Sequence, residues 1–135
     1  MQREHSSDKR RLSRPDLRLA TGRAAEEAAA KHLERCGYGI VARNWRCRTG
    51  ELDLIATDGD ALVIAEVRSR RGGATRFGTA IEAVTLRKCA QVRSTAQVYL
   101  NQTRREPSRI RFDVIAVTFA PGGEIAELKH IKGAF

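Results

Sequence analysis

The chain has 135 residues, of which 41% are hydrophobic and 30% are charged, values typical of one globular domain with its own core. Its formal net charge of +9 predicts a polyanionic partner, either nucleic acid or an acidic membrane surface. Aromatic residues are only 5% of the chain, which argues against base stacking as the main mode of binding. No apolar run reaches the length of a transmembrane helix.

The cysteines are odd in number and form no CxxC motif, and the histidines match no zinc spacing. Neither a disulfide framework nor a structural zinc is therefore expected. Reduced thiols, together with charged N-terminal residues that lack an apolar signal core, predict a cytoplasmic location.

Residues 1–18 are polar and basic, and we predict a disordered N-terminal tail there, followed by a single folded domain over residues 19–135. The tail either contacts phosphates or is simply solvated.

An alanine-rich helix is predicted from about Thr21 to Arg35, with Gly37 ending it. Helical spacing puts Glu26 at the border of the apolar stripe, where it is either a third acid of a metal site or an interfacial acid paired with an arginine.

Three strands are predicted next, at about residues 38–47, 50–56 and 61–68. Between the last two, Thr57-Asp58-Gly59-Asp60 is a strong hairpin-turn signal. A loop of two or four residues puts Asp53 opposite or diagonal to Glu66 on one face of the sheet, with Arg68 beside them.

Clustered carboxylates repel, so one pKa should rise unless a cation lies among them. Hard oxygen ligands suit Mg²⁺ or Mn²⁺, and a nearby arginine suits a phosphate or a developing oxyanion. The hairpin thus predicts a metal-dependent site that cleaves phosphodiesters. The alternative is an exposed sheet face whose acids pair with Arg and Lys.

A basic loop with glycines is predicted at residues 69–76, where Arg70, Arg71 and Arg76 either receive a phosphate backbone or are merely solvated.

A second helix is predicted from about Thr79 to Asn101, with Thr85 as a second possible start. Lys88 falls within the apolar stripe of this helix. It either extends to the edge of the core or points into a functional pocket, and packing against the sheet that carries the acids favours the pocket.

Two further strands are predicted, at residues 109–119 and 124–131. The long connection into the first of them carries the second helix, so this strand can run parallel to the third, with a right-handed crossover. The sequence predicts an α/β fold with a mixed five-stranded sheet, in which an antiparallel meander is joined to a parallel crossover, flanked by a helix on each face.

Several motifs, in this order, resemble the YraN family of small bacterial proteins. They are Glu26, Gly50-Glu51-Leu52-Asp53-Leu54-Ile55, Ala65-Glu66-Val67-Arg68, Val84-Thr85 with Lys88, Arg111-Phe112-Asp113-Val114 and Ile131-Lys132-Gly133-Ala134-Phe135. The resemblance covers roughly residues 22–135. The family is little characterised and is commonly described as a candidate endonuclease family. It is similar to the PD-(D/E)XK nuclease superfamily, especially archaeal-type Holliday junction resolvases, which implies a restriction-endonuclease-like fold.

The resemblance also implies roles for single residues. Asp53 and Glu66 would be catalytic and would bind one metal ion, together with the backbone carbonyl of Val67. Glu26 would match the first-helix glutamate of the resolvase branch. Arg68 stands where the superfamily has lysine. Because an arginine stays protonated, Arg68 is no general base, but it can hold the scissile phosphate, and Lys88 can reach the same phosphate.

The leading hypothesis is a Mg²⁺- or Mn²⁺-dependent endonuclease acting on DNA, with branched or damaged structures as candidate substrates. The alternative is a catalytically inactive nucleic-acid-binding module, or an adaptor, on the same fold. Net charge supports both equally, and Arg68 favours the alternative. A homodimer would suit a symmetrical cut in two strands. Contacts to nucleic acid are predicted for Arg68, Arg70, Arg71, Arg76 and Lys88.

Overall fold

The computed structural model describes residues 14–71 and 85–135, which form two helices and five strands. In chain order the elements are α1 (Arg14–Arg35), β1 (Gly39–Cys47), β2 (Gly50–Asp58), β3 (Ala61–Arg71), α2 (Leu86–Thr103), β4 (Arg109–Phe119) and β5 (Ile125–Ile131). The number, type and order of the elements are those that the sequence predicts.

Helix α1 begins at Arg14 rather than near Thr21, so residues 14–18 of the predicted tail are helical. A proline is compatible with the first turn of a helix, because its missing N–H would have no partner there, and Pro15 occupies that turn. The rest of the predicted tail, residues 1–13, lies outside the described part of the chain.

The end of α1 confirms the prediction for Gly37, which has a left-handed φ of 91°. The Gly37 N–H donates to the Glu34 carbonyl at 3.0 Å, and the Tyr38 N–H donates to the Leu33 carbonyl at 2.9 Å. This pair of bonds is the Schellman motif, which satisfies carbonyls that the last helical turn leaves open. The motif turns the chain directly into β1.

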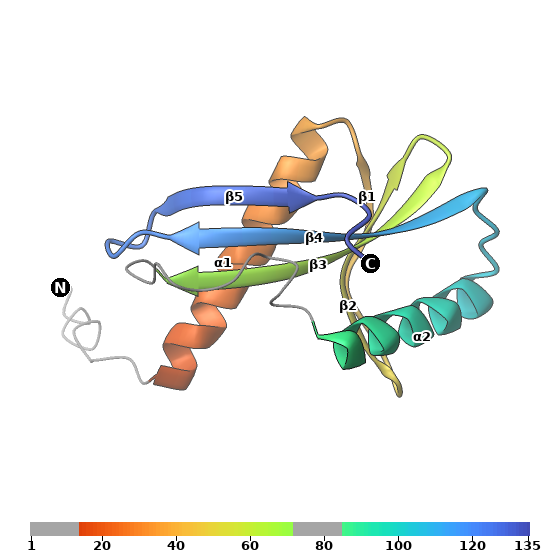
Figure 1. The fold of residues 1–135 in the computed structure, drawn as a ribbon, viewed down its shortest axis with the longest axis horizontal. Helices are drawn as coiled ribbons and strands as arrows, with labels where there is room; N and C mark the ends of the chain where they lie inside the picture. The colour runs from red at the N-terminus through yellow and green to blue at the C-terminus, as the bar shows by residue number, and fades with distance from the viewer. Residues whose placement is uncertain (1–13, 72–84) are drawn as a thin grey trace, which may run out of the picture.

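The five strands form one sheet in the order β1-β2-β3-β4-β5. Strands β3 and β4 are parallel, and the other neighbouring pairs are antiparallel. This is the predicted mixed sheet, and it is consistent with a restriction-endonuclease-like fold. The pairing of β2 with β3 ends at Leu54 and Ala65, whereas β3 pairs with β4 along its whole length. Strands β2 and β3 therefore diverge beyond this point (Figure 1).

The predicted loop at residues 69–76 is wrong for its first three residues. Ser69, Arg70 and Arg71 belong to β3, because they pair with the last three residues of β4. The remainder of that loop, with Arg76, falls outside the described residues, as do residues 79–84 of the predicted second helix. The later start at Thr85 is confirmed, because its side chain caps α2 by accepting from the Lys88 N–H at 3.1 Å.

The two helices cover opposite faces of the sheet (Figure 1). Ala29, Ala30 and Leu33 of α1 pack in one core with the α1-facing side chains of β2, β3 and β4. Val92, Ala96 and Tyr99 of α2 pack in the other core, with Ile64 and Phe112. Neither helix in the described part of the chain has a stretch long and apolar enough to cross a bilayer.

Candidate active site

The β2–β3 hairpin sets the position of the two predicted acids. Its loop has two residues, Gly59 and Asp60, because Asp58 pairs directly with Ala61. Gly59 has a φ of 63°, which the tight turn requires and glycine adopts at little cost. An even loop was the condition for placing Asp53 against Glu66, and this condition is met. The two residues come immediately after the last ladder pair, where the strands begin to separate.

Asp53 bridges the diverging strands through its side chain. Its Oδ2 accepts a hydrogen bond from the backbone N–H of Val67 at 2.9 Å. Burial raises the pKa of Asp53 to about 7, and repulsion from Glu66 acts in the same direction, while the bond from Val67 opposes the shift. Near neutral pH this carboxylate is therefore poised between its two charge states.

Glu66 is the most deeply buried acid of the pair, with 1% of its surface exposed. Its Oε1 lies 3.6 Å from the Lys88 ammonium nitrogen. Its Oε2 is buried and has no hydrogen-bond partner among the described residues. Burial raises the pKa of Glu66, and the positive charges of Lys88 and Arg68 oppose the increase. A buried acceptor without a partner is costly, so this oxygen is open to a cation or a donor.

Lys88 reaches the acids from the first turn of α2. The Thr85 cap fixes where that helix begins, and the apolar stripe of α2 packs on the sheet face that carries Glu66. The Lys88 side chain is 31% exposed and is directed at Glu66. The structure thus directs Lys88 at a buried acid of the sheet, whereas a role for it in a functional pocket stays a prediction.

Two residues join the site that sequence reasoning had not placed in it. With its amide nitrogen facing the carboxylates, Asn44 donates to Glu26 Oε1 at 3.2 Å and to Glu51 Oε2 at 3.0 Å. Asn44 has a left-handed φ of 49°, a conformation that asparagine tolerates better than most residues. Repulsion from Glu26 and Glu51 contributes to the raised pKa of Asp53. Glu51 shares a motif with Asp53 and was a visible signal, whereas Asn44 had none.

The predicted arginines follow the acids along β3. Arg68 is partly buried, and its Nε has no hydrogen-bond partner within the described chain. It lies close enough to oppose the raised pKa of Glu66. Arg70 is partly buried and Arg71 is exposed, so the end of β3 extends the positive charge away from the acids. Arg76 cannot be placed, because it lies outside the described residues.

The donor set fits a hard divalent cation only in part. Within residues 14–71 and 85–135, no three His, Cys, Asp or Glu side chains are grouped closely enough to hold a metal ion. Glu26 is therefore near the acid pair without forming a compact triad with it. The pair itself fits, since Asp53 and Glu66 repel, and the buried Glu66 Oε2 has no hydrogen-bond partner within residues 14–71 and 85–135. Carboxylate and carbonyl oxygens are the ligands that Mg²⁺ and Mn²⁺ prefer.

A second buried charge network lies on the other face of the sheet, and it was not predicted. Asp113 is fully buried and accepts from Arg111 Nε at 2.9 Å, from His130 Nε2 at 2.8 Å and from the Gly133 N–H at 3.0 Å. Arg111 also donates to Asp58 at 3.1 Å and to the Tyr38 hydroxyl at 2.7 Å. The network ties β4 to β5 and to the hairpin, which indicates a structural role.

The fold and the acid pair together define a restriction-endonuclease-like α/β protein with a buried acid–lysine site where its sheet divides. Comparison with family models then matches residues 25–117 to the uncharacterised protein family UPF0102. The chain belongs to this family, which is the YraN family, so the family resemblance stated from the sequence is confirmed. The similarity to nucleases stays a prediction.

Relatives of this family align over nearly their whole length. A UPF0102 protein of Frankia alni is 48% identical over 116 residues, which are 86% of this chain and 94% of the relative. One from Pelotomaculum thermopropionicum is 47% identical over 120 residues, 89% of this chain and 98% of the relative. One from Chloroflexus aurantiacus is 44% identical over 121 residues, with coverage of 89% and 96%.

Proposed function

We propose that this protein is a Mg²⁺- or Mn²⁺-dependent endonuclease that hydrolyses phosphodiester bonds in DNA. One observation carries the proposal: two repelling acids, Asp53 and Glu66, share a buried site with the ammonium of Lys88. Such an arrangement costs stability and is typical of a functional site rather than of a structural one. The net charge of +9 supports a polyanionic substrate.

Asp53, Glu66 and the backbone carbonyl of Val67 would hold the metal ion. When bound, a divalent ion polarises the phosphodiester and lowers the pKa of water. Lys88 and Arg68 supply positive charge next to the acids, and we propose that they hold the phosphate oxygens and stabilise charge that develops on them. The permanent charge of Arg68 excludes it as the proton acceptor.

The test is cleavage of labelled linear, single-stranded and four-way-junction DNA in Mg²⁺, Mn²⁺ or EDTA. Wild type should cut only with metal, and both Asp53→Ala and Glu66→Ala should abolish cutting. Asp60→Ala is the matched control, because it removes an exposed acid from the same hairpin. Cutting that survives in both site variants would contradict the proposal.

The second candidate is a nucleic-acid-binding module that does not cleave. Two observations favour it: Arg68 stands where the resembled superfamily has lysine, and the described residues contain no three-acid metal group. Binding without cutting on every substrate, unchanged by Asp53→Ala and by metal, would establish this function instead.

A further inference from the structure

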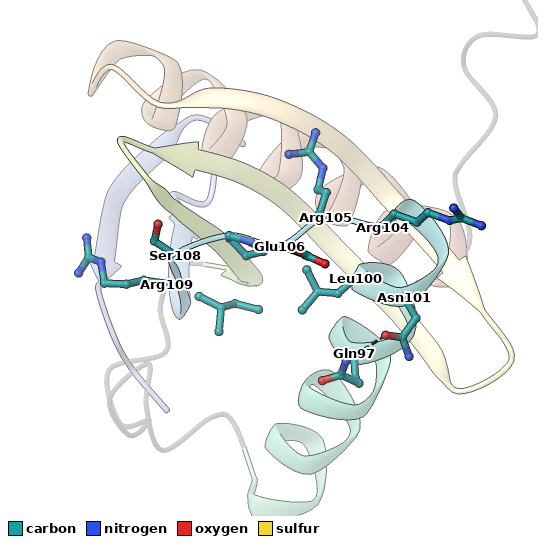
Figure 2. A pocket seen from close by; sticks show the side chains of 10 residues that line it. Gln97, Leu100, Asn101, Arg104, Arg105, Glu106, Ser108 and Arg109 are labelled. Atoms are coloured by element: carbon teal, nitrogen blue, oxygen red, sulfur yellow. Dashed lines mark hydrogen bonds between the residues drawn. The ribbon is translucent and has the colours of Figure 1, made fainter.

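A cavity of about 590 Å³ lies where α2 ends and β4 begins (Figure 2). Its volume falls within the range of small-molecule sites. Gln97, Leu100 and Asn101 line it from the helix, and the remaining lining residues come from the segment 104–110. None of the predicted site residues lines it, so this is a second place on the molecule.

The lining combines an apolar floor with groups that read hydrogen-bond patterns. Ile110 is 37% exposed within it and gives the floor apolar surface. Gln97 Nε2 donates to Asn101 Oδ1 at 3.3 Å, which leaves the Gln97 oxygen and the Asn101 amide nitrogen for a ligand. Glu106 adds a carboxylate acceptor. Amide and carboxylate groups of this kind pair with the edges of nucleobases.

The positive charges stand at the rim rather than inside. In Figure 2 the guanidinium groups of Arg104, Arg105 and Arg109 extend away from the space that Leu100 and Glu106 point into. A free phosphate would need the cations inside the cavity. A base inside, with its phosphates outside against the arginines, matches this arrangement. The helix C-terminus carries only about half a negative charge, which the adjacent Arg104 and Arg105 outweigh.

The cavity is connected to the acid pair by α2, which contains no Asp or Glu over Leu86–Thr103. Ile110 and Val114 share one face of β4, and Val114 is the register partner of Glu66, so cavity and acids lie on the same side of the sheet. At ~1.5 Å per helical residue, Lys88 and Asn101 are on the order of 20 Å apart along the axis of α2. At ~3.6 residues per turn the two residues lie on different sides of this helix, so a strand between them would cross it obliquely. That span corresponds to about six nucleotides at the ~3.4 Å step of one strand of B-form DNA.

We propose that this cavity binds one unpaired nucleotide of a nucleic-acid strand that continues along α2 to the acid pair. Only an unpaired base offers its Watson–Crick edge to Gln97, Asn101 and Glu106. This inference takes from the proposed function only that the partner is a nucleic acid. It does not require that the protein cleaves that nucleic acid. It narrows the substrate to nucleic acid that carries unpaired nucleotides.

The test is equilibrium binding in EDTA, so that cleavage plays no part. Fluorescence anisotropy would compare a blunt duplex with a duplex of equal phosphate number that carries an eight-nucleotide single-stranded extension. Wild type should bind the extended duplex about tenfold more tightly, the value of one good base contact. Equal affinity for the two duplexes would overturn the proposal.

Variants assign the preference to the cavity. Ser108→Trp fills the space from an exposed lining position. It should reduce the ratio of the affinities for the extended and the blunt duplex to about one. Ala126→Trp, at an exposed site on β5, is the matched control and should keep the preference. If Ser108→Trp retains the preference, the cavity is not the site. Circular dichroism melts verify that both variants fold.

Glu106→Gln provides a second test that leaves the shape of the cavity unchanged. A carboxylate accepts from the cytosine amino group, so this variant should lose about fivefold in affinity for a cytosine extension and little for a thymine extension. Equal losses would count against base reading. If free cytidine monophosphate competes with the extended duplex at equal concentration, the cavity binds a free nucleotide. That result would overturn the proposal that it binds a nucleotide of a strand.

The binding experiment and the cleavage experiment fail separately. A protein that cuts blunt duplex with metal but shows no extension preference keeps the proposed function and loses this inference. Ser108→Trp could instead abolish self-association in sedimentation and leave the affinity for DNA unchanged. The cavity would then belong to a contact between copies of the chain, and the inference would be overturned.

Discussion

Lys88 and Glu66 form an ion pair across the junction of α2 and the sheet, with the ammonium nitrogen 3.6 Å from the carboxylate. The pair is unequal, because Glu66 is 1% exposed and Lys88 is 31% exposed. The buried partner depends on the exposed one, since the charge of Lys88 opposes the increase in the pKa of Glu66, as does that of Arg68. Removing the lysine should therefore cost more than a surface ion pair is worth.

We expect Lys88→Met to lower the free energy of unfolding at pH 7 by about 2 kcal/mol, less than the 3–5 kcal/mol of a fully buried pair. Adding Glu66→Gln should recover most of this loss, because position 66 then no longer carries a buried charge without its partner. Urea denaturation of the two single variants and the double variant measures the coupling. Lys31→Met is the control: its pair with Glu27 is exposed at 3.9 Å and should cost under ~0.5 kcal/mol. A coupling energy near zero for Lys88 and Glu66 would contradict the prediction.

Asp53 gives the metal-free protein a distinctive pH dependence. Burial raises its pKa from 3.8 to about 7 in the folded chain, so folding favours the protonated form. The stability from this preference is fully present below pH 4 and is lost as the pH rises to about 7. In EDTA at pH 8, Asp53→Asn should therefore raise the free energy of unfolding, with roughly 4 kcal/mol as an upper bound. Urea midpoints of wild type and Asp53→Asn from pH 4 to pH 8 measure this difference in stability. A midpoint that falls more steeply with pH in the variant than in wild type would contradict the prediction.

Divalent cations should offset part of that pH trend in wild type. Binding requires ionised Asp53 and Glu66, so 10-fold to 100-fold excess of metal over its dissociation constant should stabilise by about 1.4–2.7 kcal/mol above pH 7 and by little at pH 5. Melting temperatures with Mn²⁺, Mg²⁺ or EDTA test this. Both Asp53→Asn and Glu66→Gln should abolish the response, and Asp60→Asn should retain it. A response that does not depend on pH would argue against binding at these acids.

Local signals in the sequence were sufficient for the order of the elements and for placing Asp53 opposite Glu66. The turn residues at 57–60 fixed the hairpin loop and hence the facing of Asp53 and Glu66. Gly37 and Thr85 marked helix boundaries through caps that the structure contains. Lys88 followed from the spacing of the apolar stripe of α2. Each of these signals acts within a few residues of the chain, where sequence rules are strongest.

Nonlocal contacts decided what the sequence did not show. Residues 69–71 form a strand because the far end of β4 pairs with them, although their composition is typical of a loop. The sheet divides where the Asp53 side chain accepts from the Val67 N–H. The left-handed Asn44 lies between Glu26 and Glu51 and donates to both when its amide nitrogen faces them. None of these features leaves a periodic pattern in the residues themselves.

Arg68 allows a direct test of the chemistry, because the resembled superfamily carries lysine at this position. We expect Arg68→Ala to lower the single-turnover cleavage rate about 100-fold, a common cost of losing one positioned charge at a transition state. Arg68→Lys should keep the rate within about tenfold, since a cation remains, although it loses the bidentate geometry of arginine. Arg71→Ala is the control, because Arg71 is exposed further along β3. Equal effects of Arg68→Ala and Arg71→Ala would assign Arg68 to general charge rather than to the reaction.

Asp113 should account for much of the loss in the free energy of unfolding at acidic pH. Burial alone would raise its pKa, but hydrogen bonds from His130, Arg111 and the Gly133 N–H prevail and hold the pKa at about 2, below the ordinary 3.8. Because the folded value is depressed, its contribution is present above pH 4 and is lost as the pH falls to about 2, by roughly 2 kcal/mol. Urea denaturation from pH 2 to pH 7 should show this loss in wild type. In Asp113→Asn the loss should be absent and the stability at pH 7 lower, since Arg111 and His130 lose their charged partner. Asp60→Asn, an exposed acid whose arginine partner is also exposed, should follow wild type, and an Asp113→Asn curve parallel to wild type below pH 4 would show that this carboxyl is not the titrating group.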